Sequence, residues 1–343
     1  MRVDWKSSLS RRKHSSQSRI GFTLIELLVV IVIIAILIAL VLPAISGVRT
    51  RARDVEVRKE IGDLEQAITQ FKVSYGVEPP SMVTIYKTDA QWAADPRSRA
   101  AIKRIWPKIN FAYTDPMNTN IGSGGISFPS TSVTAVHLNG AECLVFFLGG
   151  VANAAGALSG FSKNPQLPFI SDTSREGPFF EFKGAYNFTT SQWTGRLITT
   201  DDSDAMPVYL DPLPQQTRPY VYFHSNDGGS YPFETVASTP PIATWRNTDC
   251  LGYTVNMMGV PQFDINYTLM EYAYFQSFPG TGMTPLAQAR SSLPHKSKSF
   301  QIISPGADAT YGTGGLFNPE STSNLSPADR DNITNFHSGR LAN

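Results

Sequence analysis

Residues 21–45 read GFTLIELLVVIVIIAILIALVLPAI, and this stretch decides the organisation of the chain. From Leu27 to Ile45, nineteen residues carry no charge and no strongly polar side chain. At about 1.5 Å per helical residue, this run and the residues from Phe22 onwards can span a hydrocarbon core of roughly 30 Å. A buried core helix would show polar positions on at least one face. We therefore predict a membrane-spanning helix over residues 22–45.

A cleaved secretory signal peptide is the alternative for this segment. Such peptides have an apolar stretch of about 7–15 residues followed by a site of small residues. The apolar stretch here is longer, and only a weak site exists near Ala44 and Ser46. The membrane helix is favoured.

The charges that flank the apolar run do not fix its orientation. Residues 1–21 hold six of the 29 basic residues and one acid, Asp4, so this leader carries +5 and the remaining 322 residues carry −4. Five basic residues also follow the run closely: Arg49, Arg51, Arg53, Arg58 and Lys59. Because six basic residues precede the run and five follow it, the positive-inside rule hardly favours one orientation over the other.

The composition excludes several classes of protein. The chain has 343 residues, long enough for one large domain or two modest ones, and 17% of them are charged. Two cysteines exclude a disulfide-dense scaffold and a four-cysteine zinc site. A formal net charge of +1 gives no reason to expect nucleic acid as a partner.

Glu26 is the one charged residue inside the apolar context. An unpaired carboxylate there costs a few kcal/mol, about 2.5 or more by insertion scales. Either a cation, a proton or a partner subunit compensates for it, or the side chain lies in the headgroup layer.

The hexapeptide Gly21-Phe22-Thr23-Leu24-Ile25-Glu26, after a basic leader and before a long apolar run, resembles the signature of type IV prepilins and pseudopilins. Pro43 also matches a position where that family often has proline. The resemblance implies cleavage between Gly21 and Phe22 by a prepilin peptidase and N-methylation of Phe22. It further implies that the leader stays in the cytoplasm while the body lies in the periplasm, which breaks the tie in flanking charge.

This resemblance gives Glu26 a role in assembly. Cleavage would create an ammonium group on Phe22, and Glu26 of a neighbouring subunit is a natural counter-charge for it. A mismatched register would leave two buried charges unpaired, at a cost of several kcal/mol, about 3–5. The partners implied are other pseudopilin subunits, the inner-membrane secretion platform and membrane lipid.

Residues 46–76 predict an amphipathic continuation of the helix. Its apolar positions recur at steps of four and three residues: Val57, Ile61, Leu64, Ile68, Phe71 and Tyr75. Gly76 and Pro79-Pro80 end the pattern. A coiled-coil seam is the competing interpretation. Because the apolar pattern is shorter than three heptads, packing on a local sheet is favoured.

The remainder, residues 77–343, predicts a globular domain with a large loop-rich insertion at about 85–200. A helix is expected around Arg97–Ile105, with a basic face that is either solvated or a binding patch. The apolar run Ala141–Leu148 is a buried helix or a strand, because periodicity does not separate the two. Four segments predict strands: Val208–Leu210, Tyr220–Phe223, Leu269–Phe275 and Phe300–Ile303. The fold class expected is α+β, with the long N-terminal helix packed on an antiparallel β-sheet.

Two further stretches resemble the major pseudopilin of type II secretion. Asp211-Pro212 followed by Pro219-Tyr220-Val221-Tyr222 is similar to its strand pair, although the loop between them is longer. The segments from Ser304 to Thr313 and from Asp331 to Phe336 are similar to its C-terminal calcium loop. Carried over by motif, the calcium ligands would be Ser304, Asp308, Asp331 and Asn332. Oxygen donors on a glycine-rich loop suit Ca²⁺, but the alternative is a polar loop closed by hydrogen bonds.

Enzyme motifs are absent from the sequence. It contains no G-x-x-x-x-G-K-[ST], no G-x-S-x-G and no H-E-x-x-H, and its five histidines are scattered. Cys143 and Cys250 could form one disulfide outside the cytoplasm, or be two small buried residues.

These observations predict a structural subunit, a pseudopilin of a type II secretion system that is processed and assembled through its N-terminal helix. A type IV pilus subunit for adhesion, motility or DNA uptake is the first alternative. A monomeric membrane-anchored periplasmic enzyme or binding protein is an alternative of another class. The expected location is the inner membrane, as a single-pass protein with its C-terminal domain in the periplasm.

Overall fold

The computed structural model describes nine segments of the chain: residues 23–113, 135–170, 172–199, 206–225, 234–236, 242–244, 273–277, 293–312 and 314–342. The chain divides into two compact units, an N-terminal unit of residues 1–51 and a body unit of residues 52–343. Helix α1 (Leu24–Tyr75) contributes residues to both units.

The described elements confirm an α+β fold with an N-terminal helix and small sheets. The helices after α1 are α2 (Asp89–Ala94), α3 (Pro96–Ile105), α4 (Gly140–Gly149) and the short 3-10 helices η1 (Phe111–Tyr113), η4 (Thr322–Asn324) and η5 (Pro327–Asp329). The strands up to residue 224 are β1 (Val83–Tyr86), β2 (Ala135–Leu138), β3 (Phe161–Ser162), β4 (Arg175–Glu176), β5 (Tyr186–Asn187), β6 (Gln192–Trp193), β7 (Leu197–Thr199), β8 (Pro207–Tyr209) and β9 (Val221–His224). The later strands are β10 (Glu234–Val236), β11 (Ile242–Thr244), β12 (Tyr274–Ser277), β13 (Leu293–Pro294), β14 (Phe300–Ser304), β15 (Gly315–Leu316) and β16 (Ile333–Thr334).

In the N-terminal unit, α1 has an apolar surface without a covering layer among the described residues. The large apolar side chains between Leu24 and Leu40 are 45–81% exposed. Within the part of the chain that the structure describes, no helix is both long and apolar enough to cross a membrane. The span expected at residues 22–45 includes residue 22 and the side chains of residues 41–45, which lie outside the described part.

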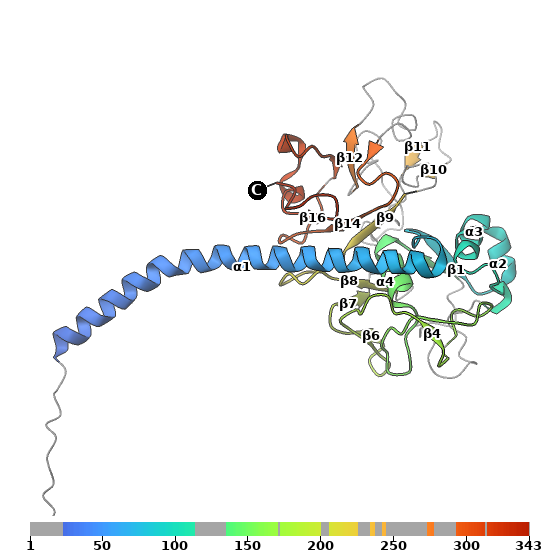
Figure 1. Ribbon diagram of the computed structural model, residues 1–343, viewed down its shortest axis with the longest axis horizontal. Helices are drawn as coiled ribbons and strands as arrows, with labels where there is room; N and C mark the ends of the chain where they lie inside the picture. Colours follow the sequence, from blue (N-terminus) through green and yellow to red (C-terminus); the bar gives the residue numbers. More distant parts are fainter. Residues whose placement is uncertain are drawn as a thin grey trace, which may run out of the picture. The chain divides into compact units, whose positions relative to one another are not determined.

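In the body unit, the predicted amphipathic stripe of α1 is confirmed. Val57, Leu64, Ile68 and Phe71 are fully buried, and Ile61 is 3% exposed. In this unit α1 runs between the β9–β14–β16 sheet and the β7–β8 pair (Figure 1). The helix therefore packs on its own body here, as the spacing of its apolar residues predicts.

The antiparallel sheet β16-β14-β9 separates two apolar clusters. In β9 and β14, Phe300 pairs with His224 and Ile303 with Val221, and β16 pairs with the other edge of β14. Tyr222 and Ile302 belong to the cluster that includes α1 and α4, whereas neighbouring Ile303 belongs to the second cluster. Because alternate side chains point to opposite faces of a strand, both faces of this sheet are buried.

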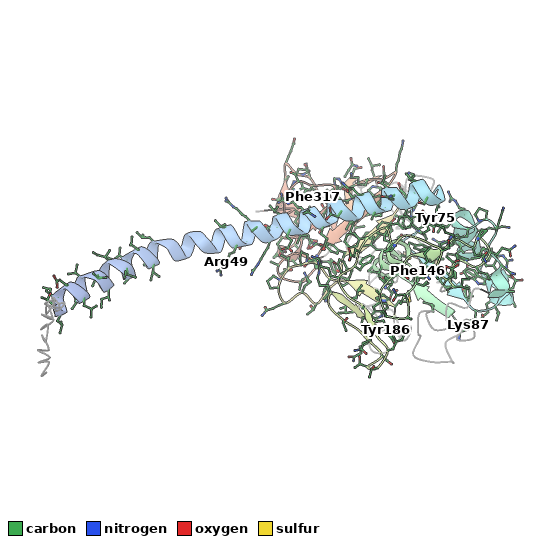
Figure 2. All side chains as sticks on the ribbon, turned by 60° about the horizontal axis from the view of Figure 1, so that its bottom comes forward. Arg49, Tyr75, Lys87, Phe146, Tyr186 and Phe317 are labelled. Atoms are coloured by element: carbon green, nitrogen blue, oxygen red, sulfur yellow. The ribbon has the colours of Figure 1, made fainter. Side chains whose placement is uncertain are left out.

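Helix α4 resolves the ambiguous apolar run at 141–148. All ten of its residues are buried, and Phe147 makes an edge contact with Phe71 of α1, with ring centroids 5.8 Å apart. Phe146 lies deep among the side chains of the body unit (Figure 2). A capping box between Asn139 and Glu142 starts the helix. The region expected as an insertion thus contributes a helix to the centre of the core.

The predicted helix around residues 97–105 is also confirmed, as α3. Its Arg99 forms an ion pair with Asp89, with nitrogen and oxygen 2.8 Å apart, and its guanidinium carbon lies 4.4 Å from the centre of the Phe111 ring.

Candidate functional site

Glu26 takes part in a capping box at the start of α1. The Thr23 backbone N–H and hydroxyl both donate to Oε2 of Glu26, at 2.8 and 2.7 Å. In return, the Glu26 backbone N–H donates to Oγ1 of Thr23 at 3.3 Å. The T-x-x-E pattern is a sequence signal for this box that the prediction did not use. Gly21 and Phe22, the predicted cleavage and methylation positions, lie outside the described residues.

In the body unit, a buried carboxylate anchors α1. Glu60 is 8% exposed and accepts hydrogen bonds from two nitrogens of the Arg196 guanidinium. The hydroxyls of Tyr209 and Tyr220 donate to the same carboxylate at 3.2 and 2.8 Å. Burial by itself lowers the pKa of Arg196, but the Glu60 carboxylate raises it above its ordinary value. This network connects α1 to β8 and to the segment before β7.

Two further polar contacts join α1 to the C-terminal residues. Arg340 donates to both oxygens of Asp54 at 2.9 Å, a bidentate pair. Asn335 donates to Oε1 of Glu65 at 2.9 Å. The end of the chain therefore holds α1 from the side of the β9–β14–β16 sheet.

The structure brings the four predicted calcium ligands to one region but uses their polar atoms differently. The Ser304 hydroxyl donates to Asp211 and accepts from the Gly306 backbone N–H at 3.2 Å. Oδ2 of Asp331 accepts from the backbone N–H groups of Ala307 and Asp308, at 2.6 and 3.0 Å. Asp331 thus closes the loop that follows β14.

Asn332 is completely buried, and its orientation is fixed by its donors. Its Nδ2 donates to the Tyr311 carbonyl oxygen and to the Tyr274 hydroxyl, both at 2.8 Å. Because a carbonyl oxygen can only accept, the amide cannot turn over without losing this bond. Among the described residues, the Oδ1 atoms of Asn332 and Asp331 are buried without a hydrogen-bond partner.

Asp211 and Asp329 belong to the same region, and the prediction assigned neither of them to the loop site. Asp329 is fully buried, and its Oδ1 accepts from the Tyr274 hydroxyl at 2.8 Å and from the Gly314 backbone N–H at 2.9 Å. Burial raises the pKa of Asp308, and the negative charges of Asp331 and Asp329 raise it further. Among the described residues, no group of three or more His, Cys, Asp or Glu side chains is arranged to hold a metal ion. A cation here would therefore depend on amide and carbonyl oxygens as well as carboxylates.

The disulfide prediction stays open. Cys143 lies in α4, is fully buried, and its thiol hydrogen-bonds to the Leu138 carbonyl oxygen at 3.6 Å. Cys250 lies outside the described residues.

Comparison with known families finds a match for the N-terminal segment. Residues 17–42 match the prokaryotic N-terminal methylation motif, the signature of type IV pilins and pseudopilins. No curated protein and no solved structure is significantly similar to the chain. The motif indicates a structural subunit that is processed by prepilin peptidase, assembles with pilin-like subunits and is anchored in the inner membrane by its N-terminal helix.

Proposed function

We propose that this prepilin-like chain is a pseudopilin of a type II secretion system. Its body stays in the periplasm, and its N-terminal helix joins those of other subunits in a short filament above the inner-membrane secretion platform. The observation that supports this choice is a contact between the two stretches that resemble the major pseudopilin, which are distant in sequence. Asp211, from the first motif, accepts a hydrogen bond from the hydroxyl of Ser304, from the second, across 93 positions.

The strand arrangement supports the same assignment. The second half of the first motif includes the first two residues of β9, the calcium-loop motif begins at the last residue of β14, and its last segment contains β16. These strands are neighbours in one antiparallel sheet. Three stretches that resemble the major pseudopilin in sequence are thus parts of one structural unit.

The mechanism is assembly rather than catalysis. The free carboxylate charge of Glu26 and a new ammonium group on Phe22 of a neighbouring subunit attract each other when helices leave the lipid. In a medium of low dielectric constant, either charge is costly without its partner. Glu26 therefore sets the register between subunits, while the capping box keeps its side chain oriented.

Deletion of the gene in its host tests the proposal. Loss of exoprotein secretion, restored by the wild-type chain, is the expected result. Loss of surface fibres with normal secretion would contradict it and favour a type IV pilus subunit. Normal secretion and normal fibres would favour an anchored enzyme or binding protein.

We also propose that the loop after β14 binds Ca²⁺ through Asp331 and Asn332, with Asp308 nearby. In the part of the chain that the structure describes, Oδ1 of Asp331 and Oδ1 of Asn332 are buried without hydrogen-bond partners. Burial and the charges of Asp331 and Asp329 raise the pKa of Asp308, and a bound cation would offset both effects. Ca²⁺ accepts carboxylate, amide and carbonyl oxygens at roughly 2.3–2.6 Å. Ser304 fits less well as a ligand because its hydroxyl is occupied by Asp211.

Thermal unfolding of the full chain in detergent tests the calcium site. Ca²⁺ should raise the midpoint by several degrees, about 4 or more at saturating concentration, and Mg²⁺ should raise it less. Asp331→Asn should remove the effect, whereas Glu320→Gln, an exposed acid, should keep it. An equal response of both variants, or none in the wild type, would contradict the site.

A further inference from the structure

Three arginines directly beyond the apolar run are not explained by assembly or by the body. Arg49, Arg51 and Arg53 belong to α1 and are all exposed. No acidic residue occurs between Glu26 and Asp54 in the sequence. The Arg49 side chain extends outward from α1 in Figure 2. Strong positive charge is thus concentrated in a short helical stretch.

Ion pairing distinguishes these arginines from other charged residues nearby. Lys59 pairs with Asp63 at 2.7 Å, and Asp54 is engaged by both Arg340 nitrogens at 2.9 Å. Within the described segments, by contrast, none of the three arginines forms an ion pair with a carboxylate. Within these segments, their guanidinium groups are therefore not neutralised by a carboxylate.

The same stretch of helix also exposes apolar side chains. Val48 and Val55 are 67% and 61% exposed, and Ala52 between them is exposed as well. At spacings of four and three residues, these side chains share one helix face. Arginine stems can lie along apolar surface while their guanidinium groups reach into water or headgroups. An apolar stripe edged by arginines is typical of segments that lie at a membrane surface.

We propose that Arg49, Arg51 and Arg53 form a basic collar that binds the headgroups of anionic phospholipids. The proposal rests on the proposed function, under which this segment follows the membrane span on the periplasmic side. Guanidinium groups bind phosphate oxygens in a bidentate manner, and each basic residue near an anionic surface strengthens binding roughly fivefold. The collar also explains why cations occur on both sides of the apolar run. Until cleavage removes the leader, they hold the subunit in the lipid from each end.

Electron paramagnetic resonance of spin-labelled lipids tests the collar with the full chain in bilayers of phosphatidylcholine and phosphatidylglycerol. The wild type should immobilise labelled phosphatidylglycerol in preference to labelled phosphatidylcholine, and high salt should weaken this preference. The triple variant R49Q/R51Q/R53Q should reduce the preference about fivefold or more. The leader is present in both proteins, so their difference isolates the collar.

A matched variant guards against a general effect of charge. K103Q/R104Q/K108Q removes the same number of cations from the body unit and should keep the preference. Equal preference in the wild type and the collar variant, or an equal loss in the matched variant, would overturn the proposal. If neither lipid is immobilised, the chain is not anchored in the bilayer, and it is the proposed function that fails.

Discussion

The two ends of α1 differ in whether the body of the chain covers their apolar side chains. Between Leu24 and Leu40, apolar residues occupy every face and are 45–81% exposed, whereas between Val57 and Phe71 they form one stripe that is 0–4% exposed. A helix that is apolar all round needs lipid or other helices, and a striped helix needs one covering surface. We therefore expect lipid or other subunits to cover the first part of the helix, whereas the body of the same chain covers the second part.

The largest effect is expected from the charge of Glu26. Glu26→Gln keeps an acceptor for the capping box but removes the charge. Incorporation into filaments should therefore fall by about a hundredfold or more, because a buried ammonium group without its partner costs about 3–5 kcal/mol. Filament yield after shearing, normalised to membrane-bound subunit, measures this. Thr23→Ala, which removes the cap and keeps the charge, should assemble. The opposite ranking of the two variants would mean that Glu26 serves only as a cap.

Apolar truncation in each half of α1 tests the comparison next. Phe71→Ala should lower the free energy of unfolding of the body by about 3–5 kcal/mol because it opens a cavity against Phe147 and Phe179. Ile33→Ala, 52% exposed, should change it by less than about 0.5 kcal/mol. Denaturant unfolding in detergent measures both. Similar losses would show that the first half also stabilises the body.

The buried carboxylate of Glu60 should matter nearly as much. Glu60→Ala leaves the Arg196 guanidinium without its counter-charge, which should cost about 3 kcal/mol. Glu56→Ala, at an exposed position four residues earlier, serves as the control and should leave unfolding unchanged. If both variants unfold like the wild type, the network does not anchor α1.

A smaller, pH-dependent effect is expected at Glu78, just beyond the end of α1. A hydrogen bond from His224 and a second from Lys72, at 3.2 and 2.9 Å, lower the pKa of Glu78 against the opposing effect of burial. A carboxyl whose folded pKa is lowered stabilises the fold above its ordinary pKa of 4.5, and this stabilisation is lost as pH falls through the lowered value. As the pH falls below 4.5, the free energy of unfolding should therefore decline less steeply for Glu78→Gln than for the wild type. Parallel curves would exclude this contribution.

Local patterns in the sequence predict local structure well in this chain. The steps of four and three residues identify the buried face of α1, and turn residues at Gly76 and Pro79 mark its end. The apolar run at 141–148 stayed ambiguous, although Asn139-x-x-Glu142 is a capping signal that favours the helix α4.

Long-range partners could not be predicted in the same way. Glu60 meets Arg196 across 136 positions, and Glu65 meets Asn335 across 270. No local spacing encodes such pairs, because the fold of the whole body brings them together. The same holds for Asp329, whose position beside Tyr274 depends on the packing of the second cluster.

The most direct test of the account is the N-terminus and intact mass of the protein recovered from host membranes. A chain that starts at N-methylated Phe22 is the predicted result. A chain that retains Met1, or one that starts near Ile45–Gly47, would contradict the assembly mechanism, because the Phe22 ammonium group that pairs with Glu26 would not exist.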